Sequence, residues 1–213
     1  MKAELTTTRS YRGLSQEERR AQRRARLIAA AIAVYGERGY HQATVKAVCE
    51  QAGLTERYFY ESFANSEALL IDSFYAVTGS VVGLIHRAAQ EAGRGRIARS
   101  RAMLHAYFAA LQHDPQSARV FLVEIRGVSR AVDQAFDAAL REIGSEVART
   151  VAPPGAPEDE LLQAGVVGGV IHIALRWIGD GYRPDIARVV DSALKLGAVL
   201  ASNGRARRLK VAQ

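Results

Sequence analysis

The stretch that decides the fold is TVKAVCEQAGLTERYFYESFANSEALL, Thr44 to Leu70, which predicts two short helices joined by a tight turn. Apolar residues recur at helical spacing as far as Ala52, and Gly53-Leu54-Thr55 then breaks the pattern. Gly53 can adopt a positive φ as a helix terminator, and Thr55 can cap the following helix through its hydroxyl. In that second helix the i, i+4 spacing of Phe59 and Phe63 predicts a buried aromatic face.

The other face of the second helix presents Arg57, Tyr58 and Glu61. A helix-turn-helix that packs one face on its neighbours and offers polar and aromatic groups on the other fits a DNA groove. Arginine can engage guanine O6 and N7, and tyrosine can contact a thymine methyl group or a phosphate. The stretch therefore predicts a DNA reader.

Residues 24–70 resemble the DNA-binding domain of the TetR family of bacterial transcriptional repressors. The matching pieces are YGERGYHQATVKAVCEQAGL, TERYFYESF and NSEALL. The resemblance covers about a quarter of the chain; the remaining residues agree with the family only in length and helical character. It implies a palindromic double-stranded DNA operator, a homodimer and a small-molecule effector as partners.

Individual DNA contacts follow from position. Thr44, at the start of the first of the two helices, can offer its hydroxyl to a phosphate or serve only as an N-cap, and both roles are compatible. The resemblance implies a phosphate contact for the Tyr60 hydroxyl, with packing of the ring against the first helix of the domain as the alternative. The predicted DNA-binding residues are Thr44, Thr55, Arg57, Tyr58, Tyr60 and Ser62.

Two departures from the family pattern bear on DNA binding. Many relatives carry a lysine where this chain has Asn65-Ser66, and Glu61 places an anion against a polyanion. Glu61 can accept a hydrogen bond from cytosine N4, or it can pair with Arg57 one helical turn earlier. The sequence leaves these two alternatives open.

Composition favours a soluble, mostly helical protein. The chain has 213 residues, 48% of them hydrophobic and 24% charged, with only five prolines. One cysteine excludes an intrachain disulfide and suits a reducing cytoplasm, where we expect the protein to reside. The most apolar run, residues 161–178, is interrupted by polar side chains, which favours a buried helix over a membrane span.

Charge is concentrated at the two ends. Of the net +7, residues 1–26 carry +5 and residues 203–213 carry +4, so the rest of the chain is slightly acidic. A basic arm can follow phosphates or enter the minor groove, and a solvated leader is the equal alternative. For the C-terminal tail a solvated segment is the preferred interpretation.

Helix breakers and caps divide the chain into about nine helices, and the predicted fold class is all-α. Ser15 and Glu18 form a plausible capping box for the first helix. The predicted domains are a basic arm (1–14), a three-helix DNA-binding domain (15–64), a helical ligand-binding and dimerisation domain (65–203) and a basic tail (204–213).

The run EDELLQAGVVGGVIHIALRWIGDG contains small residues at spacings that favour close approach of two helices. Together with one face of the last helix it predicts half of a four-helix bundle across a two-fold axis. The predicted dimer contacts are Gly165, Gly168, Gly169, His172, Val189, Ala193, Leu196 and Leu200.

Aromatic and flexible apolar residues on the central helices are candidates for an effector pocket, with ordinary core packing as the alternative for each. The candidates are Met103, His105, Tyr107, Phe108, Leu122, Arg126, Phe136, His172 and Trp177. The five histidines include no i, i+4 pair, and no nucleophile motif occurs, so we expect no metal, no cofactor and no enzymatic activity.

The preferred hypothesis is a homodimeric repressor that leaves a palindromic operator when a small molecule binds. The alternative is a helical ligand-binding or adaptor protein with a degenerate helix-turn-helix that does not read DNA. An α-helical enzyme built on the same scaffold is a third possibility, but no residue pattern nominates a substrate.

Overall fold

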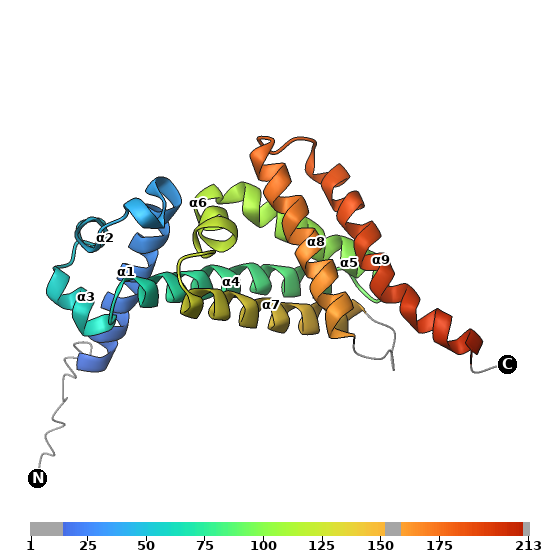
Figure 1. The fold of residues 1–213 in the computed structure, drawn as a ribbon, viewed down its shortest axis with the longest axis horizontal. Helices are drawn as coiled ribbons and strands as arrows, with labels where there is room; N and C mark the ends of the chain where they lie inside the picture. The colour runs from blue at the N-terminus through green and yellow to red at the C-terminus, as the bar shows by residue number, and fades with distance from the viewer. Residues whose placement is uncertain (1–14, 152–158, 211–213) are drawn as a thin grey trace, which may run out of the picture.

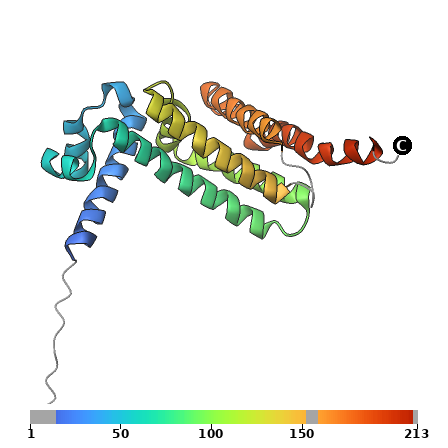
Figure 2. The ribbon, with the colours of Figure 1, turned by 60° about the horizontal axis from the view of Figure 1, so that its bottom comes forward.

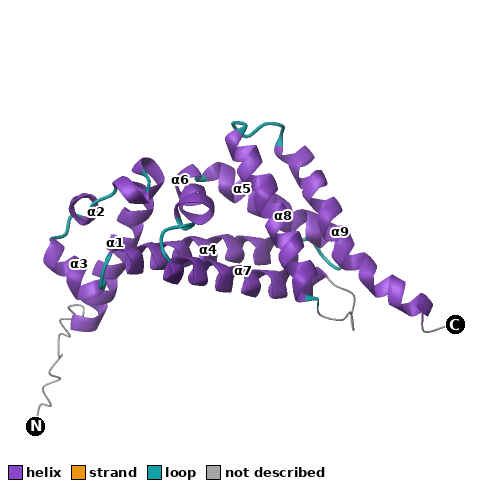
Figure 3. Cartoon of the chain, in the orientation of Figure 1, coloured by secondary structure: helices purple, strands orange, loops and turns teal. Residues whose placement is uncertain are grey.

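The computed structural model describes residues 15–151 and 159–210, with side chains as far as Ala198. Within these ranges the chain is helical and contains no strand (Figures 1 and 3). The elements are α1 (Gln16–Arg38), η1 (Tyr40–Gln42), α2 (Val45–Ala52), α3 (Glu56–Ser62), α4 (Ser66–Glu91), α5 (Arg96–His113), α6 (Pro115–Arg119), the π-helical η2 (Val120–Glu124), α7 (Arg130–Val151), α8 (Glu160–Gly179) and α9 (Ile186–Lys210). The predicted all-α fold of about nine helices is confirmed; the basic arm lies outside the described residues.

The N-terminal unit forms as its caps predict. The Ser15 hydroxyl accepts from the Glu18 backbone N–H and the Glu18 carboxylate accepts from that of Ser15, which completes the capping box. Gly53 ends α2 in the left-handed region at φ 61°, and Phe59 and Phe63 are buried. One detail differs: Thr55 occupies the N-cap of α3, but its side chain makes no capping hydrogen bond.

Helix α4 links this unit to the rest of the molecule. The Asn65 side chain accepts from the Ala68 N–H and caps α4, which then runs from α1–α3 along the length of the C-terminal part (Figures 1 and 2). Leu69, Leu70 and Phe74 are completely buried in a core to which α1, α3, α5, α7, α8 and α9 also contribute. The two parts of the protein therefore share one continuous hydrophobic core.

The C-terminal part packs α5 between α4 and α9, with α7 and α8 beside them (Figure 2). The turn between α8 and α9 is held by two hydrogen bonds: Trp177 Nε1–H donates to the Pro184 carbonyl at 2.7 Å, and the Tyr182 hydroxyl donates to the Leu111 carbonyl at 3.2 Å. Helix α9 begins at Ile186 and continues to Lys210.

Two helices are long and apolar enough to cross a membrane by length and composition alone. They are α4, with a mean hydropathy of 1.8, and α8, with a mean hydropathy of 1.5. Core packing accounts for α4. Helix α8 is less covered: only 28% of its apolar window is buried within the chain, so this helix offers an apolar surface that the protomer leaves open.

Candidate nucleic-acid interface and ligand cavity

The exposed face of α3 is the candidate DNA-reading surface. The Arg57 side chain is 84% exposed and Tyr60 is 61% exposed. Arg57 Nε–H donates to Glu61 Oε1 at 3.0 Å, and Arg23 Nη2 lies 3.9 Å from the same carboxylate. In the free protein, the pairing alternative for Glu61 is thus the one realised. Tyr60 packs edge-on against Phe59 of its own helix and stays exposed, so the side chain is accessible for the predicted phosphate contact.

The other predicted contacts differ in accessibility. Tyr58 is half-buried because the Arg23 guanidinium lies 4.5 Å from its ring centroid, so it faces α1 more than was predicted. The Ser62 hydroxyl donates to the Tyr58 carbonyl at 2.9 Å. Thr44 is the N-cap of α2 and accepts from the Ala47 N–H at 3.1 Å, while Thr55 is exposed.

Arginines of α1 hold the helix-turn-helix in place. From the sequence these arginines count toward the basic N-terminal end, and the charge count does not predict this structural role. Arg20 donates to the Glu61 carbonyl at 3.1 Å, and Arg26 donates to the Ala52 carbonyl at 2.6 Å. Arg24 pairs with Asp72 and lies over the Phe63 ring. The helical periodicity of the run RRAQRRAR could have indicated this, because it places arginines on the side of α1 that faces α2 and α3.

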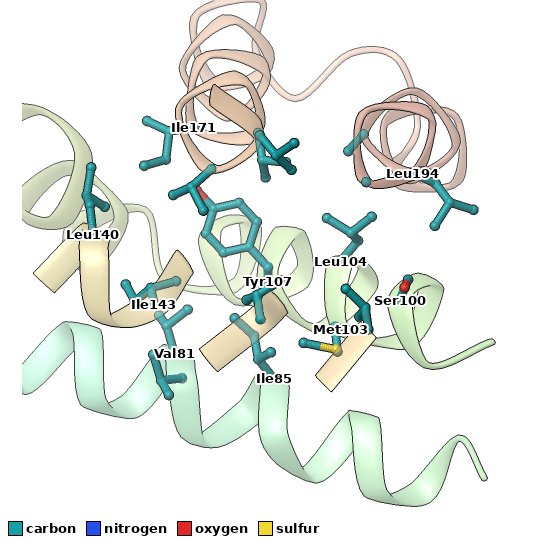
Figure 4. A pocket seen from close by; sticks show the side chains of 18 of the residues that line it. Val81, Ile85, Ser100, Met103, Leu104, Tyr107, Leu140, Ile143, Ile171 and Leu194 are labelled. Carbon is teal, nitrogen blue, oxygen red and sulfur yellow. The ribbon is translucent and has the colours of Figure 1, made fainter. Parts of the chain in front are cut away.

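A cavity of about 110 Å³ lies between α4, α5, α7, α8 and α9 (Figure 4). Its lining is almost entirely aliphatic, including Val81, Ile85, Leu104, Ile143 and Ile171. The Thr78 hydroxyl is occupied, since it donates to the Phe74 carbonyl at 2.8 Å.

Tyr107 is the distinctive polar group of this cavity. Its ring projects from α5 between α4 and α8 (Figure 4), and the residue is 7% exposed. The hydroxyl is buried without a hydrogen-bond partner, and burial raises the pKa of this phenol well above its ordinary value. A buried hydroxyl without a partner is costly, so the site is suited to a ligand that supplies an acceptor.

The predicted pocket residues divide into three groups. Met103 and Tyr107 line the cavity. Phe108, Leu122, Phe136 and Trp177 are buried but lie outside its lining, because they pack against other core residues; Phe108 and Trp177, for example, meet edge to face. His105, Arg126 and His172 are exposed. The sequence missed the aliphatic lining, since aliphatic side chains at helical spacing are indistinguishable from ordinary core.

The predicted dimer residues also divide. Gly165, Gly168 and His172 are exposed on α8, and no neighbour lies within 4 Å of a Cβ built on either glycine. Gly169 instead meets Leu196 within the chain, at 2.9 Å from such a Cβ.

Two residues of α9 need correction as dimer contacts. Val189 and Ala193 are 4% and 0% exposed because α9 turns this face toward the core, which leaves them almost no surface for a second chain. Leu200 lies beyond the residues whose side chains are described.

Cys49 is buried on α2, and burial, followed by the charge of Glu56, raises the pKa of its thiol. A buried, protonated thiol is a poor nucleophile and fits its prediction as a small core residue. Among the described residues no group of three or more His, Cys, Asp or Glu side chains could hold a metal ion.

A helix-turn-helix braced by α1 and joined through α4 to a helical domain with an apolar cavity defines a DNA-binding regulator. Residues 27–72 match the family described as bacterial regulatory proteins, tetR family. The match identifies this segment as a TetR-type DNA-binding domain.

The similarity to known proteins extends over most of the chain. The HTH-type transcriptional activator FasR of Mycolicibacterium smegmatis is 24% identical over 76% of this chain and 74% of its own length. The fatty acid degradation regulator FadR of Bacillus halodurans superposes with a TM-score of 0.71 at 21% identity, covering 87% of this chain and 96% of that one.

The FadR of Bacillus subtilis, solved in complex with stearoyl-CoA, superposes with a TM-score of 0.66 at 24% identity, covering 84% of this chain and 98% of that one. These relatives do not favour the alternative of an adaptor protein with a degenerate helix-turn-helix.

Proposed function

We propose that this protein is a homodimeric repressor that binds a palindromic operator in the cytoplasm and releases it when an acyl-chain ligand enters the cavity. The observation that carries the ligand class is the cavity itself, whose lining is mostly apolar and whose buried Tyr107 hydroxyl has no hydrogen-bond partner. A flexible hydrocarbon chain gains free energy from such a lining without leaving polar groups unsatisfied. The similar structures support this class, since one is titled a fatty acid degradation regulator and another was solved in complex with stearoyl-CoA.

A contiguous set of contacts offers a route from the cavity to the DNA-binding domain. Phe121, on η2, lines the cavity and stacks on Phe74 of α4 with ring centroids 5.7 Å apart. At the end of the same π-helical turn, Glu124 accepts from the Tyr40 N–H at 2.7 Å and from Arg119 Nε–H at 2.7 Å. Arg119 in turn donates to the carbonyls that end α1, those of Gly36 and Glu37. Displacement of Phe121 by a ligand would therefore move the anchor of the DNA-binding domain.

The dimer is proposed to form through α8, together with the outward face of α9. Leu161 is 88% exposed, and Gly165, Gly168 and His172 continue the same exposed face toward the C-terminal end of α8. An apolar helix face with small residues is suited to close packing against its own symmetry mate. Two such chains would present two α3 helices to successive major grooves, about 34 Å apart. The DNA-binding domain would comprise residues 15–64, and residues 65–203 would bind ligand and partner.

The test is operator selection followed by ligand titration. Purified protein is incubated with a pool of genomic DNA fragments, bound fragments are sequenced, and the affinity for the recovered site is measured with and without stearoyl-CoA. We expect one palindromic sequence, bound at least about tenfold more weakly in the presence of ligand. If the protein bound DNA only in a sequence-independent, salt-sensitive way, the proposed role as a specific regulator would be wrong. If it bound one sequence specifically but acyl ligands did not change the affinity, only the proposed ligand class would be wrong. Transcription from the recovered promoter then tests repression, since FasR is named an activator.

A further inference from the structure

The hydroxyl of Tyr107 lies within the apolar cavity and has hydrocarbon on both sides. Figure 4 shows aliphatic side chains on either side of the tyrosine ring, Leu140 and Ile143 on one and Leu104 on the other. The hydroxyl points toward α8 (Figure 4). The part of α8 that lines the cavity is aliphatic as well, and consists of Val166, Val167, Val170 and Ile171.

Two other hydroxyl side chains belong to the described lining, those of Thr78 and Ser100. The Thr78 proton is used in the hydrogen bond to the Phe74 carbonyl. Ser100 is partly exposed and lies seven residues before Tyr107, about 10 Å away along α5. The Tyr107 hydroxyl, in contrast, is a buried donor whose proton has no acceptor.

A single water molecule is a poor partner for this hydroxyl. Buried water molecules typically make about three hydrogen bonds, and small cavities with apolar walls stay dry. A water molecule beside Tyr107 would meet aliphatic side chains on its other sides. An organic ligand avoids this cost, because the acceptor and the apolar groups that fill the cavity belong to the same molecule.

The surroundings of Tyr107 select an uncharged acceptor. Among the described residues that line the cavity, none is Lys, Arg, His, Asp or Glu. A carboxylate buried there would lose its hydration without meeting a cation, which costs far more than burial of a keto, ester or hydroxyl oxygen. Burial raises the pKa of Tyr107, so the hydroxyl keeps its proton and can donate to such an oxygen.

We propose that the cavity binds an apolar chain that carries an uncharged oxygen along its length, and that Tyr107 is the specificity-determining residue that donates a hydrogen bond to this oxygen. The inference rests on the proposed function, because it requires an acyl-chain ligand in the cavity. The oxygen lies between two hydrocarbon segments of the ligand, since Tyr107 has aliphatic walls on both sides. The ligand class is thereby narrowed from plain saturated chains to oxygenated ones, such as keto- or hydroxy-acyl chains.

The experiment compares stearoyl-CoA with a series of keto analogues in which a carbonyl replaces one methylene group at successive positions along the chain. Isothermal titration calorimetry on the full-length wild type and on Tyr107→Phe gives, for each protein, the ratio of the affinity for a keto analogue to that for stearoyl-CoA. The CoA group and the rest of the chain contribute equally in both proteins, so a change in this ratio isolates the contact between hydroxyl and carbonyl. For at least one keto position the ratio should be at least about tenfold higher in wild type, because Tyr107→Phe leaves the buried carbonyl without a donor.

Ser100→Ala is the matched control, since it removes a hydroxyl from the same helix and the same lining. It should keep the wild-type ratio at every keto position. A second measurement reports the hydrogen bond directly: the stretching band of an isotopically labelled keto carbonyl should lie at lower frequency in the wild-type complex than in the Tyr107→Phe complex. Circular dichroism verifies that both variants are folded.

The outcomes separate this proposal from the one it rests on. If the ratio were the same in wild type and Tyr107→Phe at every keto position while stearoyl-CoA still bound, the oxygenated ligand class would be wrong and the acyl-binding cavity would stand. Equal weakening of stearoyl-CoA and of all keto analogues by Tyr107→Phe would have the same meaning, because the contact would then lie at the thioester or within the fold. If Ser100→Ala lowered the ratio as much as Tyr107→Phe, the assignment to Tyr107 would be overturned. If wild type bound none of these ligands, the acyl-ligand function itself would fail, and this proposal with it.

Discussion

At the scale of single residues, two side chains of this protein have interactions that binding of a ligand or of DNA would change. Tyr107 keeps a buried hydroxyl without an acceptor, and Glu61 holds Arg57, the one cation of α3, in an ion pair. A ligand can supply the hydrogen-bond acceptor that Tyr107 lacks, and DNA competes with Glu61 for Arg57. A substitution at each site should therefore change stability or DNA affinity in a definite direction.

Tyr107→Phe should leave the free protein as stable as wild type or up to about 1 kcal/mol more stable, because it removes an unsatisfied buried hydroxyl. Tyr182→Phe is the matched control and should destabilise by about 1 kcal/mol, since its hydroxyl donates to Leu111. Urea unfolding checks both, and a loss in Tyr107→Phe as large as in the control would show that the hydroxyl has a partner.

The same substitution has a pH signature. Burial raises the pKa of Tyr107 in the folded state, so the folded protein binds this proton more tightly than the unfolded chain does. The resulting stability is fully present below the ordinary tyrosine pKa of about 10 and is lost as pH rises above it. Tyr107→Phe should therefore lose less stability than wild type above that pH.

Glu61→Gln should strengthen binding to the operator, by roughly two- to tenfold at low salt, because it releases Arg57 and removes an anion from the DNA-facing helix. Arg57→Ala should weaken binding and reduce the preference for the selected palindrome. Anisotropy titrations at several salt concentrations measure both effects. Weaker binding by Glu61→Gln would indicate that the carboxylate reads a base instead.

At the scale of elements, α1 and α6 approach each other closely where the two parts of the protein meet. A Cβ at Gly36 would lie 2.5 Å from Gln116 Cβ and 2.7 Å from its Cα, and a backbone neighbour cannot easily retreat. The adjacent Arg119 and Glu124 contacts fix the same end of α1, so this junction sets the orientation of the DNA-binding domain.

Gly36→Ala should therefore destabilise the protein by about 1–3 kcal/mol and weaken operator binding, because α1 and α6 must separate. Gly79→Ala on α4 is the matched control: no atom lies within 4 Å of its added methyl group, so it should stabilise by about 0.5–1 kcal/mol through helix propensity. Thermal unfolding and operator titration check the pair. Unchanged stability in Gly36→Ala would contradict the close approach of these two helices.

At the scale of the whole molecule, the exposed face of α8 should decide the oligomeric state. Gly168→Arg places a long cation on that exposed face, where no atom lies within 4 Å of an added Cβ, so the protomer should stay folded. We expect a monomer with at least about a hundredfold weaker affinity for a palindrome, because the two half-sites would no longer be bound together. Sedimentation velocity measures the state, and Gln134→Arg, on an exposed position of α7, is the control. A dimer that survives in Gly168→Arg would place the interface elsewhere.

The sequence by itself determined the local features of this protein. Caps, glycine turns and helical spacing are encoded within a few residues, so the capping box at Ser15, the αL turn at Gly53 and the buried face of Phe59 could all be predicted. The resemblance of residues 24–70 added the family, because those motifs are themselves local.

Only the tertiary structure decided which side chains meet across helices. Met103 and Tyr107 line the cavity while Phe108 does not, and Val189 turns inward while Gly168 faces out, because these outcomes depend on how five helices rotate against one another. The pairing of Arg57 with Glu61 was one of two local alternatives, and the side-chain geometry selected it. Periodicity specifies that a helix has an apolar face, but the packing of the other helices determines what that face contacts.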